Sequence, residues 1–222
     1  MADIAASVLA RLKNKAAESG RSYQLCLQLF CQEEFLRRLE KSKYAENLVL
    51  KGGLFLYTLT DFDSRVTVDV DFLLRQIPTQ LPEFESPMIN TYSVETTVAE
   101  KLDAILNLME FSSRMKDYYD IYYIANRLDF DGEVLTEALR KTFLNREHSF
   151  SLEQFQRVMN FADDAAMQKK WKAFVSRINT KTDDYGTVLK TIRNFIEKPF
   201  VAAVENKIFT KHWSAANSTW AS

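Results

Sequence analysis

Residues 65–72 read RVTVDVDF, and apolar and polar side chains alternate strictly along this stretch. Strict alternation predicts a β-strand, because successive side chains of a strand point to opposite faces. The apolar face carries Val66, Val68, Val70 and Phe72. The polar face carries Arg65, Thr67, Asp69 and Asp71. The stretch therefore predicts a strand with one buried face and one face that carries chemical groups.

Asp69 and Asp71 form a D-x-D pattern on this predicted strand. Side chains at positions i and i+2 project from one face about 6 to 7 Å apart, so both carboxylates can share a divalent ion. Mg²⁺ suits such a pair, because it takes one or two protein carboxylates, keeps water ligands and completes its shell with substrate phosphate. The alternative interpretation is a solvated strand face without a metal.

A glycine pair, Gly52-Gly53, precedes this strand and lies between a predicted short strand (48–51) and a predicted short helix (54–60). Without side chains, the backbone here can approach a phosphate closely, and the helix that follows offers free N–H groups. The alternative is a tight turn that needs a positive φ. The order of strand, Gly-Gly, helix and D-x-D strand is the layout of a polymerase-β-like nucleotidyltransferase core.

The composition of the 222-residue chain is that of a soluble globular protein, with 46% apolar and 27% charged residues. Five Gly and four Pro are too few for an all-β sandwich or barrel, which needs many tight turns. From residue 93 onward, apolar residues recur at helical spacing. We therefore expect an α+β fold: a nucleotidyltransferase-like α/β unit with a small mixed sheet and two N-terminal helices over residues 1–92, and a helical domain over residues 93–222.

The sequence also excludes several classes of protein and of site. No run approaches the roughly 18 uninterrupted apolar residues of a membrane span, and the N-terminus does not have the pattern of a signal peptide. Cys26 and Cys31 are five residues apart in a helical pattern, which favours reduced thiols. With only His148 and His212, neither a histidine-rich zinc centre nor a Ser-His-Asp site is favoured. We expect a cytoplasmic protein whose chemistry rests on carboxylates and lysines.

Positive charge is concentrated toward the end of the chain. Residues 165–222 contain ten Lys or Arg and four Asp or Glu, a balance of +6 in a chain of formal charge −1. The basic side chains include Lys169, Lys170, Lys172 and Arg177. They fit contacts with an RNA backbone, and they fit a solvated helix face equally well.

Two further stretches hold charged residues at unusual places in helical patterns. Lys101 lies beside the apolar stripe of a predicted helix. It is either a cation that binds phosphate or a lysine whose aliphatic chain covers the edge of the core. Asp117 heads the stripe of the next predicted helix, where a buried carboxylate must be paired. Arg114 and Lys101 are the candidate partners. The alternative to a catalytic role is a structural ion pair between the two helices.

Together these stretches resemble the AbiEii/AbiGii-type nucleotidyltransferases, toxins of abortive-infection and type IV toxin–antitoxin systems. The resemblance rests on KGGLFL (51–56), RVTVDVDF (65–72), YSVETTVAEKL (92–102) and RMKDYYDIY (114–122), in this order. The tail, with Phe195, Pro199, Trp213 and Trp220, also looks like the ending of that family.

The resemblance implies a role for each motif. Lys51, Gly52, Gly53, Arg65 and Thr67 would bind the nucleotide, and Asp69 and Asp71 would bind one or two Mg²⁺ ions. Lys101 and Asp117 would be catalytic, with Arg114, Lys116 and Asp120 in support. The implied reaction transfers a nucleotide from an NTP to an RNA acceptor, with the tRNA 3′ end as the leading candidate. An antitoxin partner from a two-gene system is also implied, and no membrane.

The sequence departs from the family pattern after the D-x-D strand. The family carries a longer stretch there, with a further strand that bears a third metal carboxylate. Here residues 73–92 span the interval, and its acids, Glu83 and Glu85, lie among prolines. Three alternatives follow: another acid such as Asp117 takes the place of the missing one, a partner completes the site, or the chemistry is lost. The alternatives to a transferase are therefore a degenerate member that binds nucleotide or a partner, and a metal-dependent phosphate-ester hydrolase.

Overall fold

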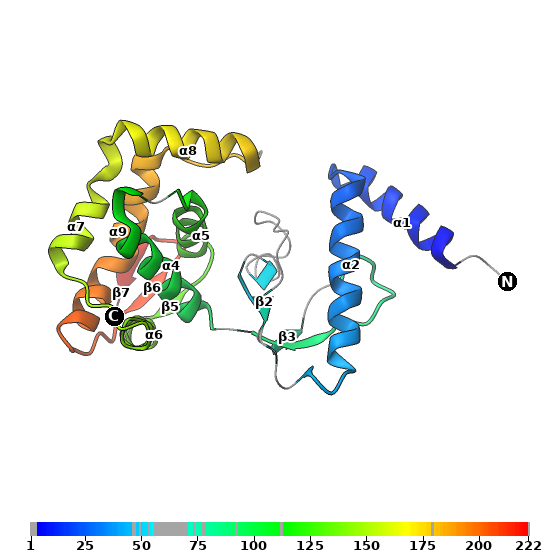
Figure 1. Ribbon diagram of the computed structural model, residues 1–222, viewed down its shortest axis with the longest axis horizontal. Coiled ribbons are helices and arrows are strands. Elements are labelled where there is room, and N and C mark those ends of the chain that lie inside the picture. Colours follow the sequence, from blue (N-terminus) through cyan, green and yellow to red (C-terminus); the bar gives the residue numbers. More distant parts are fainter. Residues whose placement is uncertain are drawn as a thin grey trace. The chain divides into compact units, whose positions relative to one another are not determined.

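The computed structural model describes residues 4–45, 48, 50–52, 54–55, 71–72, 74–76, 79–91, 93–111, 113–178 and 180–221. The chain divides into two compact units, Met1–Tyr92 and Ser93–Ser222, and we describe each by itself (Figure 1). Helices make up most of the described chain, and the strands are two or three residues long. The predicted mixed α+β class, rich in helix, is confirmed.

The first unit begins with two helices that pack against each other, α1 (Ile4–Ser19) and α2 (Tyr23–Glu40). Gly20, with φ +67°, ends the first helix, and the Ser22 hydroxyl caps the second by accepting from the Leu25 amide. Val8 and Leu12 of α1 form a small core with Leu81, which lies in the interval of residues 73–92. The helices that the apolar spacing predicts are therefore confirmed.

The strands of the first unit form two antiparallel pairs. β1 (Leu50–Lys51) pairs with β2 (Asp71–Phe72), and β3 (Leu74–Gln76) pairs with β4 (Met88–Asn90). A single parallel bridge joins Leu50 to Thr91. Residues 56–70, which include most of the predicted D-x-D strand, lie outside the described residues.

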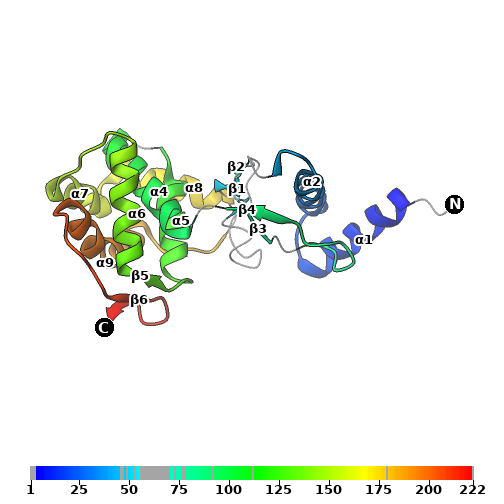
Figure 2. The same ribbon diagram turned by 90° about the horizontal axis from the view of Figure 1, so that it is seen from below.

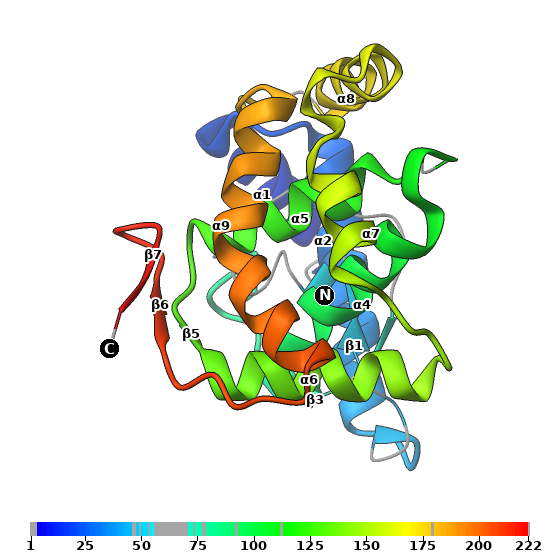
Figure 3. The same cartoon turned by 90° about the vertical axis from the view of Figure 1, so that its left-hand side faces the viewer.

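The second unit is built on the helices that are labelled α4 to α9 in Figure 3. Their predicted apolar stripes are buried. These helices are α4 (Val94–Leu108), α5 (Met115–Ala125), α6 (Gly132–Asn145), α7 (Leu152–Met159), α8 (Ala165–Ile178) and α9 (Tyr185–Val204), with short 3₁₀ turns at Met109–Phe111 and Phe161–Asp163. α4 packs on α5 and α6, and α9 packs on both of those. Ser151 and Gln154 form a capping box at the start of α7.

The expectation that residues 93–222 are entirely helical is wrong in one respect. β5 (Phe130–Asp131), β6 (His212–Ser214) and β7 (Thr219–Ala221) form a three-stranded antiparallel sheet, in the order β5-β6-β7. Figure 2 labels β5 and β6, and Figure 3 labels all three strands. Strands of two or three residues show no alternation that a sequence pattern can detect. The sheet depends on contacts distant in the chain: the Trp213 indole donates to the Ala125 carbonyl, and Trp213 and Trp220 both lie against Phe195.

No helix in the described part of the chain is both long enough and apolar enough to cross a membrane.

Candidate functional site

Lys101 of α4 joins two aspartates of α5. Its Nζ lies 3.2 Å from Asp117 Oδ1 and 2.7 Å from Asp120 Oδ2. The other oxygen of Asp117 accepts from Arg114 Nε at 2.6 Å. We call these four residues the Lys101–Asp117–Asp120 cluster, with Arg114 at its edge. The pairing that burial requires of Asp117 is confirmed, and both candidate partners supply it.

The charges of this cluster balance in a buried setting. Both aspartates are buried, the Lys101 side chain is 11% exposed, and the Arg114 side chain is 49% exposed. Two cations face two carboxylates, so the charges that this group places in the interior are compensated within it. Only its edge, at Arg114, reaches solvent. The cluster can therefore hold a lysine ammonium rigidly next to the protein surface.

Local structure explains why Asp117 and Asp120 share one face. α5 begins at Met115, and Asp117 falls in its first turn, where a carboxylate interacts favourably with the helix dipole. Asp120 follows one turn later on the same side. Sequence reasoning gave Asp120 only a supporting place. The signal that could have raised it is this i, i+3 spacing from Asp117 on a helix that buries both.

The remaining residues of this motif divide between the surface and the core. Lys116 is exposed, and the structure gives it no place in the cluster. Tyr118 and Tyr119 are buried core aromatics. Tyr118 packs edge-on against Tyr185, and burial raises the pKa of its phenol to about 12. Tyr122 donates its hydroxyl to Asp183.

The glycine motif lies at the end of the β1–β2 pair in the other unit. Gly52 has φ +78°, so the positive φ expected of a glycine turn is confirmed at this position. The strand register pairs Lys51 with Asp71, which places Asp71 opposite the residue that leads into the turn. The predicted residues Gly53, Arg65, Thr67 and Asp69 lie outside the described residues.

No group of three or more His, Cys, Asp or Glu side chains in the described ranges is arranged to hold a metal ion. One half of the D-x-D pair, Asp69, is not among the residues searched. The proposed magnesium ligands therefore remain a prediction from the sequence.

The two acids of the shortened interval face the helices of their own unit. Glu83 pairs with Arg11 of α1. Glu85 pairs with Lys41, at 3.1 Å, just after α2, and its carbonyl accepts from Arg37. Both acids therefore attach the connector to the two N-terminal helices. Nothing in the sequence pattern indicated these partners, because they lie more than 40 residues away.

A second buried charge cluster was not predicted from the sequence. Asp103 of α4 is 1% exposed, and it accepts from Arg146 Nη1 at 2.8 Å and lies 2.7 Å from His148 Nδ1. Arg146 also contacts Glu100 at 3.1 Å. This cluster ties α4 to the turn after α6. The separation of the partners by more than 40 residues hides it from any spacing rule.

The four basic residues that the sequence analysis named near the end of the chain lie on α8. Lys169, Lys172 and Arg177 are exposed, and Lys170 is half-buried. The other face of this helix buries Met167, Trp171 and Phe174. The arrangement is that of an amphipathic helix with a cationic outer face.

Comparison with known proteins gives one family. The family model described as "Nucleotidyl transferase AbiEii toxin, Type IV TA system" matches residues 34–84 and 74–206. No curated protein and no solved structure matches the chain. The chain therefore belongs to the AbiEii family of nucleotidyltransferase toxins. Membership supports a nucleotidyltransferase toxin with a nucleotide substrate and an antitoxin partner. The suspected resemblance is confirmed, and the two matched segments meet within the interval where the family pattern is shortened.

Proposed function

We propose that this protein is a Mg²⁺-dependent nucleotidyltransferase that transfers a nucleotide from an NTP to an RNA acceptor, with the tRNA 3′ end as the acceptor. In this reaction the acceptor hydroxyl oxygen bonds to the α-phosphorus, the bond from that phosphorus to the bridging oxygen breaks, pyrophosphate leaves, and the hydroxyl proton passes to a base or to water. We further propose that the first unit has the polymerase-β-like arrangement.

The observation that carries this proposal is the strand register at the glycine turn. Lys51 and Asp71 are paired across β1 and β2, and Gly52 follows directly with a positive φ. Paired residues of antiparallel strands lie about 4.5 to 5.5 Å apart at their Cα atoms. A carboxylate of the D-x-D motif thus belongs to a residue next to a turn whose backbone suits phosphate, in a chain of the AbiEii family.

The donor chemistry of Asp69 and Asp71 fits Mg²⁺, which prefers carboxylate oxygens and leaves room for substrate phosphate. When bound there, the ion would neutralise charge on the transferring phosphate. We assign the ammonium of Lys101 to the same task at the polyphosphate, and Asp117 and Asp120 to its orientation. Both carboxylates hold this ammonium within its own unit.

The test is incubation of the full chain with α-labelled NTPs, a tRNA pool and MgCl₂, followed by electrophoresis of the RNA. Label should enter RNA, and Asp69→Asn, Asp71→Asn and Lys101→Met should each reduce its incorporation by at least about 100-fold, typical of lost transition-state charge stabilisation. Lys13→Met, at an exposed position of α1, is the control for a lost lysine. Incorporation that survives these three substitutions would refute the proposed site.

The second candidate function is nucleotide or partner binding without transfer. It is favoured by the ion pairs of Glu83 and Glu85, which engage the acids of the shortened interval with Arg11 and Lys41. This candidate predicts NTP binding in equilibrium dialysis without labelled RNA. Turnover would exclude it, and release of free nucleotide without an acceptor would indicate hydrolysis instead.

A further inference from the structure

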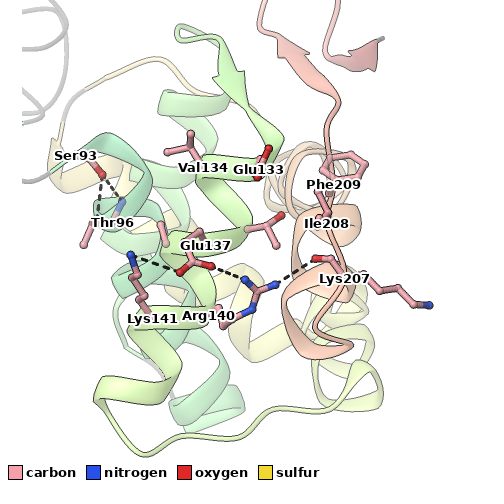
Figure 4. A pocket seen from close by; sticks show the side chains of 12 residues that line it. Ser93, Thr96, Glu133, Val134, Glu137, Arg140, Lys141, Lys207, Ile208 and Phe209 are labelled. Carbon is pink, nitrogen blue, oxygen red and sulfur yellow. Dashed lines mark hydrogen bonds and ion pairs between the residues drawn. The ribbon is translucent and has the colours of Figure 1, made fainter.

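A pocket of about 490 Å³ lies along the outer face of α6, separate from the residues of the Lys101–Asp117–Asp120 cluster (Figure 4). Its floor is α6, from Glu133 to Lys141. One wall is the start of α4, at Ser93 and Thr96, and the other is the segment that follows α9, residues 207–209. The volume falls within the roughly 300 to 1,000 Å³ typical of small-molecule sites.

Tertiary contacts fix the wall that follows α9. At one end the Gly132 amide donates to the Lys211 carbonyl at 2.8 Å. At the other end Arg140 Nη2 donates to the Lys207 carbonyl at 3.2 Å. Ile208 and Phe209 line the pocket between these two anchors. The pocket is therefore formed by two parts of the chain that are held at both ends.

The pocket offers apolar surface that the fold leaves uncovered. Val134 on the floor is 50% exposed and Ile208 on the wall is 76% exposed. Phe209 and Ala138 line the same space. Apolar surface of this kind gains free energy when an apolar ligand covers it.

Two cations of the pocket share one carboxylate. Both carboxylate oxygens of Glu137 are engaged, one by Arg140 and one by Lys141 at 3.5 Å. An anionic group of a ligand could join Glu137 as a second partner of these two cations.

Charge favours an anion at the same end. Arg140 and Lys141 share the single carboxylate of Glu137, which leaves one positive charge in excess, and Lys207 pairs with Glu205 at 2.6 Å. Glu133 lies seven residues before Arg140, about 10 Å away along the helix axis, so its charge is at the opposite end of the pocket. The end formed by Arg140 and Lys141 thus has the excess positive charge.

We propose that this pocket binds a small amphipathic anion. Its alkyl or aryl body would cover Val134, Ile208 and Phe209, and its carboxylate or phosphate group would lie at the end formed by Arg140 and Lys141. The site does not depend on the proposed transferase activity.

The experiment is isothermal titration of the full chain with octanoate, and with octylammonium and octanol as probes of matched length. We expect saturable binding of octanoate, at least fivefold weaker binding of octanol, and none of octylammonium. Arg140→Gln and Ile208→Ala should each weaken octanoate at least threefold.

A matched control lies on the same helix outside the pocket. Leu144→Ala truncates another exposed apolar side chain. It should bind octanoate as the unsubstituted chain does, and circular dichroism should show that every variant is folded. Absence of saturable binding, equal binding of octanoate and octylammonium, or equal losses in the control and the pocket variants would overturn the proposal.

Discussion

The Lys101 ammonium lies 2.7 Å from Asp120 Oδ2, closer than the 3.2 Å that separates it from Asp117 Oδ1. One lysine of α4 thus holds two carboxylates of α5. Asp120, to which the family resemblance gave only a supporting role, is its nearer partner. Because both aspartates are buried, this contact joins two helices as well as positioning a cation. Substitution of Lys101 should therefore affect both stability and transfer, and the two effects must be measured separately.

Lys101→Met should lower the free energy of unfolding by about 3 to 5 kcal/mol, because it leaves two buried carboxylates with only Arg114 as a compensating cation of the cluster. Lys101→Arg, which keeps the charge, should lose much less stability. Urea unfolding followed by tryptophan fluorescence measures this directly, since Trp171, Trp213 and Trp220 all belong to the same unit as the cluster. Equal stability of the Met and Arg variants would contradict the ion-pair account.

Glu33 should make the first unit less stable as pH rises from 4.5 to 7. Burial raises the pKa of this carboxyl to about 7, although the backbone N–H of Gln80 donates to both of its oxygens and Arg37 is near. The folded state therefore binds more protons than the unfolded state across this range, and stability falls with rising pH until about pH 7.

Glu33→Gln should remove this dependence, because an amide keeps an acceptor for Gln80 and carries no charge. Its gain in stability over the unsubstituted chain should be larger at pH 8 than at pH 5 by on the order of 2 to 3 kcal/mol. Hydrogen exchange of α2 and of residues 79–91 measures it, since residues 1–92 contain no Trp. Glu34→Gln, at the next and more exposed position, should show no such gain. The same change with pH in both variants would contradict the assignment to Glu33.

Gly132→Ala should destabilise the second unit by about 1 to 3 kcal/mol through overpacking. A Cβ at this position would lie 2.6 Å from the Lys211 carbonyl oxygen and 2.8 Å from that of Phe209, and both are backbone atoms. Gly186→Ala is the matched control, because its nearest contact, 3.1 Å away, is the exposed side chain of Asp184. Equal stability of the two variants in urea unfolding would contradict the prediction. It would show that the segment with Phe209 and Lys211 moves away from the added methyl group without a cost in stability.

The outer face of α8 should contribute to RNA affinity in proportion to its charge. Replacement of Lys169, Lys172 and Arg177 by Gln should reduce the slope of log K against log salt concentration by about 2 to 3, at roughly 0.7 to 0.9 per phosphate contact. Filter binding of tRNA between 50 and 200 mM salt, which is about the range over which such slopes are resolved, measures it. The control replaces Lys13, Arg38 and Lys43, three exposed cations of the other unit. Equal slopes in both triple variants would contradict a specific RNA contact by α8 and would favour the interpretation of its outer face as a solvated helix face.

Several elements could be predicted from the sequence because their causes are local. The stripe of α4, the capping box of α7 and the N-cap at Ser22 depend on residues three or four positions apart, which a helix brings together without help from the rest of the fold. The demand that Asp117 be paired also follows locally, since a carboxylate on an apolar stripe cannot remain alone. The motifs that carry the family resemblance include the stripe of α4 and Asp117.

Other features depend on which distant segments pack together. The shorter contact of Lys101 with Asp120, the contact of Glu33 with Gln80, and the pairing of β5 with β6 all link positions 19 to 83 residues apart. No local spacing encodes them, because the burial that creates them exists only once the chain has folded. By itself, the sequence determined the α+β class, the family and the motif residues. The tertiary structure alone decided which carboxylate holds Lys101 most closely and where the pocket on α6 lies, because both depend on desolvation and contact between distant segments.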